Sequence, residues 1–253
     1  MKHLVIPDCH VKDGSDSSYL AWAGKFAAEH KPDVIVNLGD FADMSSLSTY
    51  DVGKKSFEGK RYTKDIEAAN QGMNEFLSPI LTERIRLIDN KKKKWTPRMV
   101  LTLGNHEERI NRAINNDPKL EGLISVDDLG YEGNWEVFPY LEVVVVDGIA
   151  YSHYFTSGVL GRPVTSAKAL TSKKHMSCIM GHVQTTEIDM SQFRADGSPI
   201  IGIFAGCFYQ HDEDYLGAQG NTQHRGIWML YEVENGSFWP HFISMSYLKK
   251  KYS

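Results

Sequence analysis

The chain has 253 residues, of which 42% are hydrophobic and 24% are charged, and its net charge is −4. These values are typical of a globular protein with a sizeable core, exclude a membrane span of ~18 apolar residues, and argue against a surface devoted wholly to nucleic acid. Three widely spaced cysteines indicate neither disulfides nor a thiolate zinc site, and with no secretory signal we expect a cytoplasmic protein that does not contact membranes.

The first half of the chain alternates strand and helix patterns. Apolar runs at 2–7, 33–38 and 99–103 have the length and composition of buried strands. Between them, residues 19–30 and 63–89 carry the apolar residues of helices. This β-α-β-α-β order predicts a largely parallel sheet with helices packed against it.

The second half predicts three β-hairpins. Each is centred on a pair of residues that tolerates positive φ, as a type I′ turn requires. The pairs are Asp147-Gly148, Asp196-Gly197 and Asn235-Gly236. Three successive hairpins predict a mostly antiparallel second sheet. Because no linker rich in Pro, Gly or Ser separates the halves, we expect a single domain over residues 1–253, in which two sheets pack together with helices outside.

Two polar segments, 44–62 and 115–139, lack clear periodicity. Long irregular segments in a compact domain are usually lids or binding loops, so we expect both to contribute to substrate selectivity. The first contains the basic pairs Lys54-Lys55 and Lys60-Arg61, and a run of four lysines follows the second expected helix at 91–94.

Polar residues directly follow four of the expected strands. Each motif alone is common, since Gly-Asp is often only a turn with a helix cap. Together they favour one site, because the C-terminal ends of neighbouring strands converge in an open α/β sheet. The four motifs are Asp8-Cys9-His10, Gly39-Asp40-Phe41-Ala42-Asp43, Gly104-Asn105-His106-Glu107 and Gly181-His182-Val183-Gln184.

These residue types suit a two-metal hydrolytic centre. Two divalent ions roughly 3.5–4 Å apart stabilise the negative charge of phosphate-ester hydrolysis and acidify a bound water. An aspartate can bridge such a pair, while imidazole and amide groups fill the other positions. Mixed nitrogen and oxygen ligands suit manganese, iron, nickel or zinc.

The order of these motifs, together with a later strand-end His153, resembles that of the calcineurin-like metallophosphoesterase superfamily, from residue 8 to residue 184. The resemblance implies a four-layer αββα sandwich of two packed mixed β-sheets flanked by helices. It also implies hydrolysis of phosphomonoesters or phosphodiesters by a metal-bridging hydroxide. The Gly206-Cys207 turn, Tyr215 and Trp228 are similar to compact phage and bacterial members; a phage protein would act in the host cytoplasm.

The resemblance implies a role for each site residue. Asp8 and His10 would bind the first metal, and Asp40 would bridge both. His106 would be the catalytic residue, a histidine outside the ligand set that protonates or stabilises the leaving oxygen. Asp43 would orient a neighbouring side chain rather than bind metal. The second metal would be held by Asn105, His153 and His182.

One position departs from the family pattern. The last motif is usually Gly-His-x-His, but Gln184 stands where the second histidine would complete the first metal site. Its carbonyl oxygen is a harder and weaker ligand than imidazole. We predict that Gln184 is a metal ligand and that this site is labile or favours manganese or magnesium. Manganese is the first expectation for both ions, with iron, nickel, zinc and magnesium as alternatives.

The substrate stays open at this stage. A nucleotide or small phosphate ester ranks first, and a nuclease of the repair-exonuclease type ranks second because of the basic loops. A metal-stabilised binding module without turnover is the alternative from another class. His106 argues against that module, which has no need of a histidine outside the ligand set. Arg109 could contact a phosphate or pair with its own helix, and His211 and His224 could approach the site.

Overall fold

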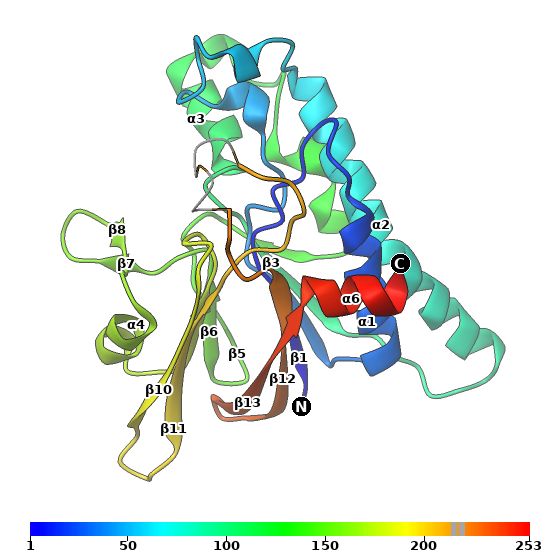
Figure 1. Ribbon diagram of the computed structural model, residues 1–253, viewed down its shortest axis with the longest axis vertical. Coiled ribbons are helices and arrows are strands. Elements are labelled where there is room, and N and C mark those ends of the chain that lie inside the picture. The colour runs from blue at the N-terminus through cyan, green and yellow to red at the C-terminus, as the bar shows by residue number, and fades with distance from the viewer. Residues whose placement is uncertain (214–216, 218–220) are drawn as a thin grey trace.

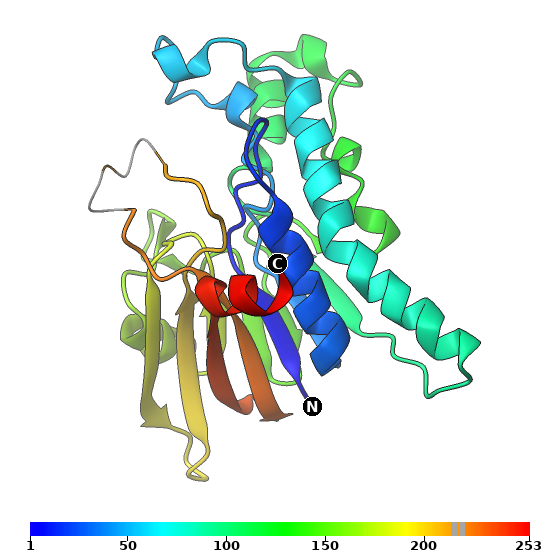
Figure 2. The same cartoon turned by 45° about the vertical axis from the view of Figure 1, so that its right-hand side comes forward.

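The computed structural model of the chain describes residues 1–213, 217 and 221–253 (Figure 1). Tyr215, one of the residues that suggested a compact phage or bacterial relative, lies outside the described residues. Within the described part, two β-sheets pack face to face and helices cover their outer faces (Figures 1 and 2). No helix in that part combines the length and the apolar composition needed to cross a bilayer.

The first sheet has six strands in the order β13-β12-β1-β2-β3-β4. Four of them run parallel, namely β1 (His3–Ile6), β2 (Val34–Asn37), β3 (Arg98–Thr102) and β4 (Glu136–Phe138). The hairpin of β12 (Gly226–Glu234) and β13 (Ser237–Ser244) joins this sheet, with β12 antiparallel to β1. In this register Val5 lies opposite both Val36 and Trp228.

The second sheet has five strands in the order β10-β11-β9-β6-β5. The inner strands β11, β9 and β6 are parallel, and β10 and β5 pair antiparallel to them at the edges. A separate two-stranded ribbon is formed by β7 and β8. The bounds are β5 (Val144–Val146), β6 (Ile149–Ser152), β7 (Thr156–Ser157), β8 (Arg162–Pro163), β9 (Cys178–Met180), β10 (Thr186–Phe193) and β11 (Pro199–Ala205).

The helices form the two outer layers. On the first sheet lie α1 (Ser18–His30), α2 (Tyr62–Asp89) and α6 (Met245–Tyr252), and α4 (Ala167–Lys174) lies on the second. The short α3 (Glu108–Asn116) follows β3. Five 3-10 turns complete the described elements: η1 (Ser45–Leu47), η2 (Lys55–Phe57), η3 (Pro118–Leu120), η4 (Val126–Leu129) and η5 (Tyr131–Gly133).

Alternating strand residues enter different hydrophobic cores. In β1, Leu4 and Ile6 pack under the helices of the first sheet, whereas Val5 packs between the sheets. In β9, Ile179 packs between the sheets, whereas Cys178 and Met180 face α4. Strands buried on both faces explain the continuous apolar runs of the sequence. Three cores between four layers confirm the expected αββα sandwich of two mixed sheets.

Two details of the expected topology are wrong. The second sheet is not mostly antiparallel, because β9 pairs in parallel with a strand on each side. The third hairpin, around Asn235-Gly236, belongs to the first sheet rather than the second. A turn motif specifies which two strands pair locally, but the partner of the hairpin's free edge is set by long-range contacts. The segment 115–139, expected to be irregular, also supplies β4.

Candidate metal centre

The site is built from loops that follow β1, β2, β3, β6 and β9. At four of its residues the backbone has positive φ, with values of 44° at His10, 47° at Asp40, 66° at His182 and 60° at Gln184. Positive φ is uncommon outside glycine, and such conformations gather where function holds a side chain in place. The positive φ angles thus direct these four side chains at the cost of strain in the backbone.

Two glycines let the loops come close together. A Cβ atom on Gly104 would lie 2.1 Å from Oδ1 of Asp40, and one on Gly181 would lie 2.2 Å from Oδ1 of Asp8. No side chain fits in that space. The glycines that precede the Asn-His and His motifs are therefore required by the close approach of two carboxylates.

Three of the residues expected at the second metal converge on one another. The Oδ1 atom of Asn105 lies 2.9 Å from Nε2 of His153 and 2.7 Å from Nδ1 of His182. His153 Nε2 is also 3.3 Å from Oδ2 of Asp40. Metal–ligand bonds of about 2.1 Å put neighbouring ligand atoms of an octahedral ion about 3 Å apart, so these spacings fit one ion.

Around the first expected metal the groups are slightly more open. Nε2 of His10 lies 3.7 Å from Oδ2 of Asp40 and 4.0 Å from Oδ2 of Asp8. The amide nitrogen of Gln184 is 3.3 Å from Nε2 of His10. The assignment of oxygen and nitrogen in a glutamine amide rests on its hydrogen bonds, so a half-turn would direct Oε1 to the same place.

Among the described residues, two groups of three side chains have ligand atoms close enough to hold a metal ion. One contains His10 and His106, the other contains His153 and His182, and both contain Asp40. Oδ2 of Asp40 lies within 3.3–3.8 Å of three imidazole nitrogens. Asp40 therefore occupies the position expected of a bridging carboxylate, and the donor set fits a pair of cations.

His106 has partners that fix its ring. Its Nδ1 atom lies 2.8 Å from both the carbonyl oxygen and Oδ1 of Asp43, so Nδ1 donates to this residue. Arg109 donates to the same carbonyl oxygen at 2.8 Å and lies 3.3 Å from Nε2 of His106. Nε2 is thereby turned toward Asp40, 3.8 Å away. Asp43 thus contacts and orients a neighbouring side chain, and that side chain is His106.

Burial and neighbouring charges shift the pKa values of the site residues in different directions. Burial raises the pKa of Asp8 to about 6, and the charge of Asp40 adds to this effect. Burial acts on Asp40 too, but the charges of His153 and His106 hold its pKa well below the ordinary value. Burial and the charge of His153 lower the pKa of His182 to about 4. Buried carboxylates at this density are costly without a compensating charge, which a metal ion supplies.

Two functional acids escaped the sequence analysis. The buried carboxylate of Glu107 accepts hydrogen bonds from the backbone nitrogens of Asp40 at 3.0 Å, Ala42 at 2.9 Å and Gly104 at 2.9 Å. It therefore ties the second ligand loop to the third. Its place in the Gly-Asn-His-Glu motif was the signal for it.

The second such acid is Glu213, which has no motif around it. Its Oε1 lies 3.4 Å from Nδ1 of His10 and 2.8 Å from Nε2 of His211, and Lys12 approaches Oε2 at 3.1 Å. Glu213 thus orients His10 through Nδ1, while Nε2 of the same ring faces Asp40. His211 reaches the site through this carboxylate.

The surface above these residues is hollowed. A cavity of about 600 Å³ is lined by residues of the candidate centre, including Asp40, Asn105 and His106, and by Tyr50 and Lys54 from the segment 44–62. This volume is of the size that accepts a small organic ligand. The candidate ligands that line this cavity are therefore accessible from it.

Comparisons with solved structures find distant similarity to two phosphoesterases. A phosphoesterase from E. coli, Yfce, is 12% identical with a TM-score of 0.41, over 97% of this chain and 100% of that one. A predicted phosphoesterase from Streptococcus pneumoniae TIGR4, a conserved uncharacterized protein, is 11% identical with a TM-score of 0.33, over 96% and 97%. Both are too distant to inform the site. No curated protein matches the chain.

The match to a family model is more extensive. It runs over residues 1–189, which include every residue expected at the metal centre, and the model is described as calcineurin-like phosphoesterase. The expectations of manganese and of a phage or bacterial relative stay predictions. By this match, which covers well over half of its length, the chain belongs to the calcineurin-like phosphoesterase family.

Proposed function

We propose that the protein is a dinuclear-metal phosphoesterase that hydrolyses phosphomonoesters or phosphodiesters. The observation that supports it most is the position of Asp40, whose Oδ2 atom is shared by both groups of candidate ligands. A carboxylate placed in this way can hold two cations at once. The first ion would take Asp8, His10 and Gln184, and the second would take Asn105, His153 and His182, with Asp40 common to both.

When bound, the two ions supply charge stabilisation at the phosphoryl oxygens and lower the pKa of a water molecule. Manganese is the ion that this oxygen-rich donor set favours first. The chain's own contribution is to hold the ligands in place. Glu107 fixes the loop of Asp40, and Glu213 fixes the ring of His10.

His106 would deliver the proton that the leaving group needs. Asp43 keeps the Nδ1 proton of the ring engaged, so Nε2 is the atom that faces the cavity. A protonated Nε2 can donate to the leaving oxygen, and Arg109 beside it adds positive charge at the same point. The pair would therefore stabilise the negative charge that develops there.

Replacement of the shared carboxylate tests the proposal. The native protein, supplied with manganese, is expected to bind two ions per chain and to hydrolyse p-nitrophenyl or bis-p-nitrophenyl phosphate. Asp40→Asn should reduce the bound metal and lower kcat by about 10²-fold or more, because one bridging charge is lost. The matched control is Asp89→Asn, at an exposed position at the end of α2, which should behave like the native protein.

Two outcomes would contradict the proposal. Full hydrolysis by Asp40→Asn would remove the shared carboxylate from the mechanism. Two ions bound to the native protein without any turnover of monoesters or diesters would instead favour the metal-stabilised binding module.

A further inference from the structure

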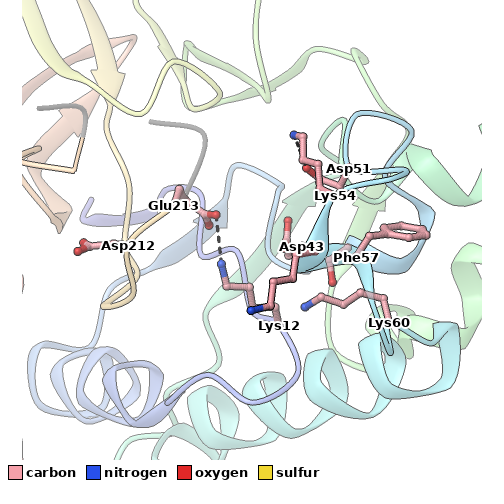
Figure 3. A pocket seen from close by; sticks show the side chains of 10 residues that line it. Lys12, Asp43, Asp51, Lys54, Phe57, Lys60, Asp212 and Glu213 are labelled. Carbon is pink, nitrogen blue, oxygen red and sulfur yellow. Dashed lines mark hydrogen bonds and ion pairs between the residues drawn. The ribbon is translucent and has the colours of Figure 1, made fainter. Parts of the chain in front are cut away.

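A second cavity adjoins the candidate metal centre and is lined by lysines (Figure 3). Its volume is about 810 Å³. It shares Asp43, Asp51, Lys54 and Glu213 with the cavity above the metal ligands, so the two hollows are continuous along that wall. In Figure 3, Lys60 and Phe57 approach from the side opposite Asp212. A ligand held by the metal centre can therefore extend into this second cavity.

The acids of the second cavity already have partners. Asp51 pairs with Lys54 at 2.8 Å, and Glu213 pairs with Lys12 at 3.1 Å. Asp43 contacts His106 and lies 3.7 Å from a guanidinium nitrogen of Arg109.

The remaining acid, Asp212, pairs with Arg225 at 3.0 Å. Lys55 and Lys60 have no ion pair or hydrogen bond from their ammonium groups among the described residues. They leave the wall with uncompensated positive charge that an anionic ligand would neutralise.

The position of these two lysines decides which anion fits. Lys55 and Lys60 line the second cavity but not the cavity of the metal ligands. A ligand that contacts both the candidate metal centre and these lysines must therefore extend beyond the first cavity.

Aromatic side chains accompany the charge. Phe57 lines the second cavity, and Tyr50, whose side chain is 81% exposed, lines the first. Exposed aromatic rings beside a basic groove are the usual means of holding the bases of a single strand.

We infer that the substrate is a single-stranded nucleic acid, whose scissile phosphate lies at the metal centre while a neighbouring phosphate binds Lys55 and Lys60. This rests on the proposed phosphoesterase function and names its substrate class. Tyr50 and Phe57 would stack on bases next to the cleaved bond.

The test compares two substrates on one enzyme. Native protein with manganese is assayed on a short single-stranded oligodeoxynucleotide and on bis-p-nitrophenyl phosphate, a diester without a second phosphate. In the double variant Lys55→Gln/Lys60→Gln, the ratio of kcat/KM for the oligonucleotide to that for the small diester should fall about tenfold at low salt. The slope of log kcat/KM against log salt for the oligonucleotide should become shallower by about 1.4, or about 0.7 per lysine.

A matched lysine pair provides the control. Lys92 and Lys93 are exposed and follow the end of α2 (Figure 2), a helix about 42 Å long whose other end begins two residues after the cavity residue Lys60. Lys92→Gln/Lys93→Gln removes the same charge, and it should leave the ratio and the salt slope unchanged.

Each contrary result would overturn a different part of the proposal. Turnover of the small diester without cleavage of the oligonucleotide overturns the nucleic-acid substrate and leaves the phosphoesterase proposal intact. An equal loss in both lysine pairs reduces the effect to overall charge and also overturns the inference. A nucleoside diphosphate with the same dependence on Lys55 and Lys60 would overturn the requirement for a spaced phosphate. Failure to hydrolyse either ester removes the proposed function itself.

Discussion

Two groups of side chains around buried histidines lie at opposite ends of β1, and their contacts differ. At its start, His3 is fully buried, and each ring nitrogen has one partner, the Tyr151 hydroxyl at 2.8 Å and Asp147 at 2.9 Å. Beyond its end, three imidazoles crowd around one oxygen of Asp40. The first group satisfies its hydrogen bonds within the chain, and the second concentrates ligands on one point.

The difference separates a structural histidine from a functional one. Burial does not distinguish the two groups, since His3, His10 and His153 all have 0% exposure and His106 has 8%. What differs is how the ring nitrogens are used. Each nitrogen of His3 has its own partner, whereas three imidazoles share one oxygen of Asp40, whose backbone has positive φ. A buried histidine becomes a candidate ligand when several such groups share a single acceptor.

The largest effect is expected at His106. His106→Asn should lower kcat by about 10²–10⁴-fold, the usual contribution of a general acid. Bound metal and the free energy of unfolding should stay the same, because the ring is a proton donor and not a ligand in the proposed mechanism. Metal analysis and urea titration check this, with the exposed His241→Asn as control. A variant that loses metal would make His106 a ligand, which its distance to His10 and Asp40 also permits.

An intermediate effect is expected at Gln184. Gln184→Ala should weaken the binding of one of the two ions by about 10–100-fold and leave the other unchanged. Tyr209→Phe, which removes the hydroxyl that lies 2.9 Å from the side-chain amide of Gln184, should have a smaller effect in the same direction. Metal titration measures both. Two equally tight sites in the native protein and in Gln184→Ala would exclude the glutamine from the ligand set.

The smallest effect concerns His3 and is one of stability. Burial lowers its pKa below the ordinary 6.5, although Asp147 acts in the opposite direction. Below pH 6.5 the unfolded chain binds a proton that the folded ring does not, so the free energy of unfolding falls as the pH falls. The loss ends at the lowered pKa, and it cannot exceed about 1.4 kcal/mol per pH unit.

The comparison of native protein with His3→Gln isolates this contribution from the other histidines. Urea titrations between about pH 5 and 8 should show a steeper loss of stability in the native protein. Parallel curves would mean that His3 does not titrate differently in the two states. Turnover at pH 8 should be unaffected, in contrast to His106→Asn.

The candidate site follows from local sequence to a large extent. Asp40, Asn105, His153 and His182 each end an apolar strand, and the structure brings all four within hydrogen-bonding range of a neighbour in the set. The reason is that parallel strands present their C-terminal ends at one edge. The family resemblance also implies that Asp43 orients a neighbour, but it does not identify His106 as that neighbour.

Other features depend on contacts that no local pattern encodes. Glu213 lies in an irregular polar stretch and meets His10 only through the folding of the distant chain. β4 has three residues, Glu136–Phe138, too few for a strand pattern. The Asn235-Gly236 pair predicts a hairpin, but the position of that hairpin beside β1 is fixed by strand pairs such as Val5 with Trp228.

That last pairing affects how the protein is made. A ribosome releases β1 and β2 early, whereas β12, the second neighbour of β1, is among the last strands to be synthesised. Phe208, also late in the chain, donates its backbone N–H to the carbonyl oxygen of Asp8 at 2.7 Å. Until these partners emerge, one edge of β1 lacks a neighbour, and such long-range pairing is slow. The nascent chain therefore completes the surroundings of its earliest candidate ligand, Asp8, only near the end of translation.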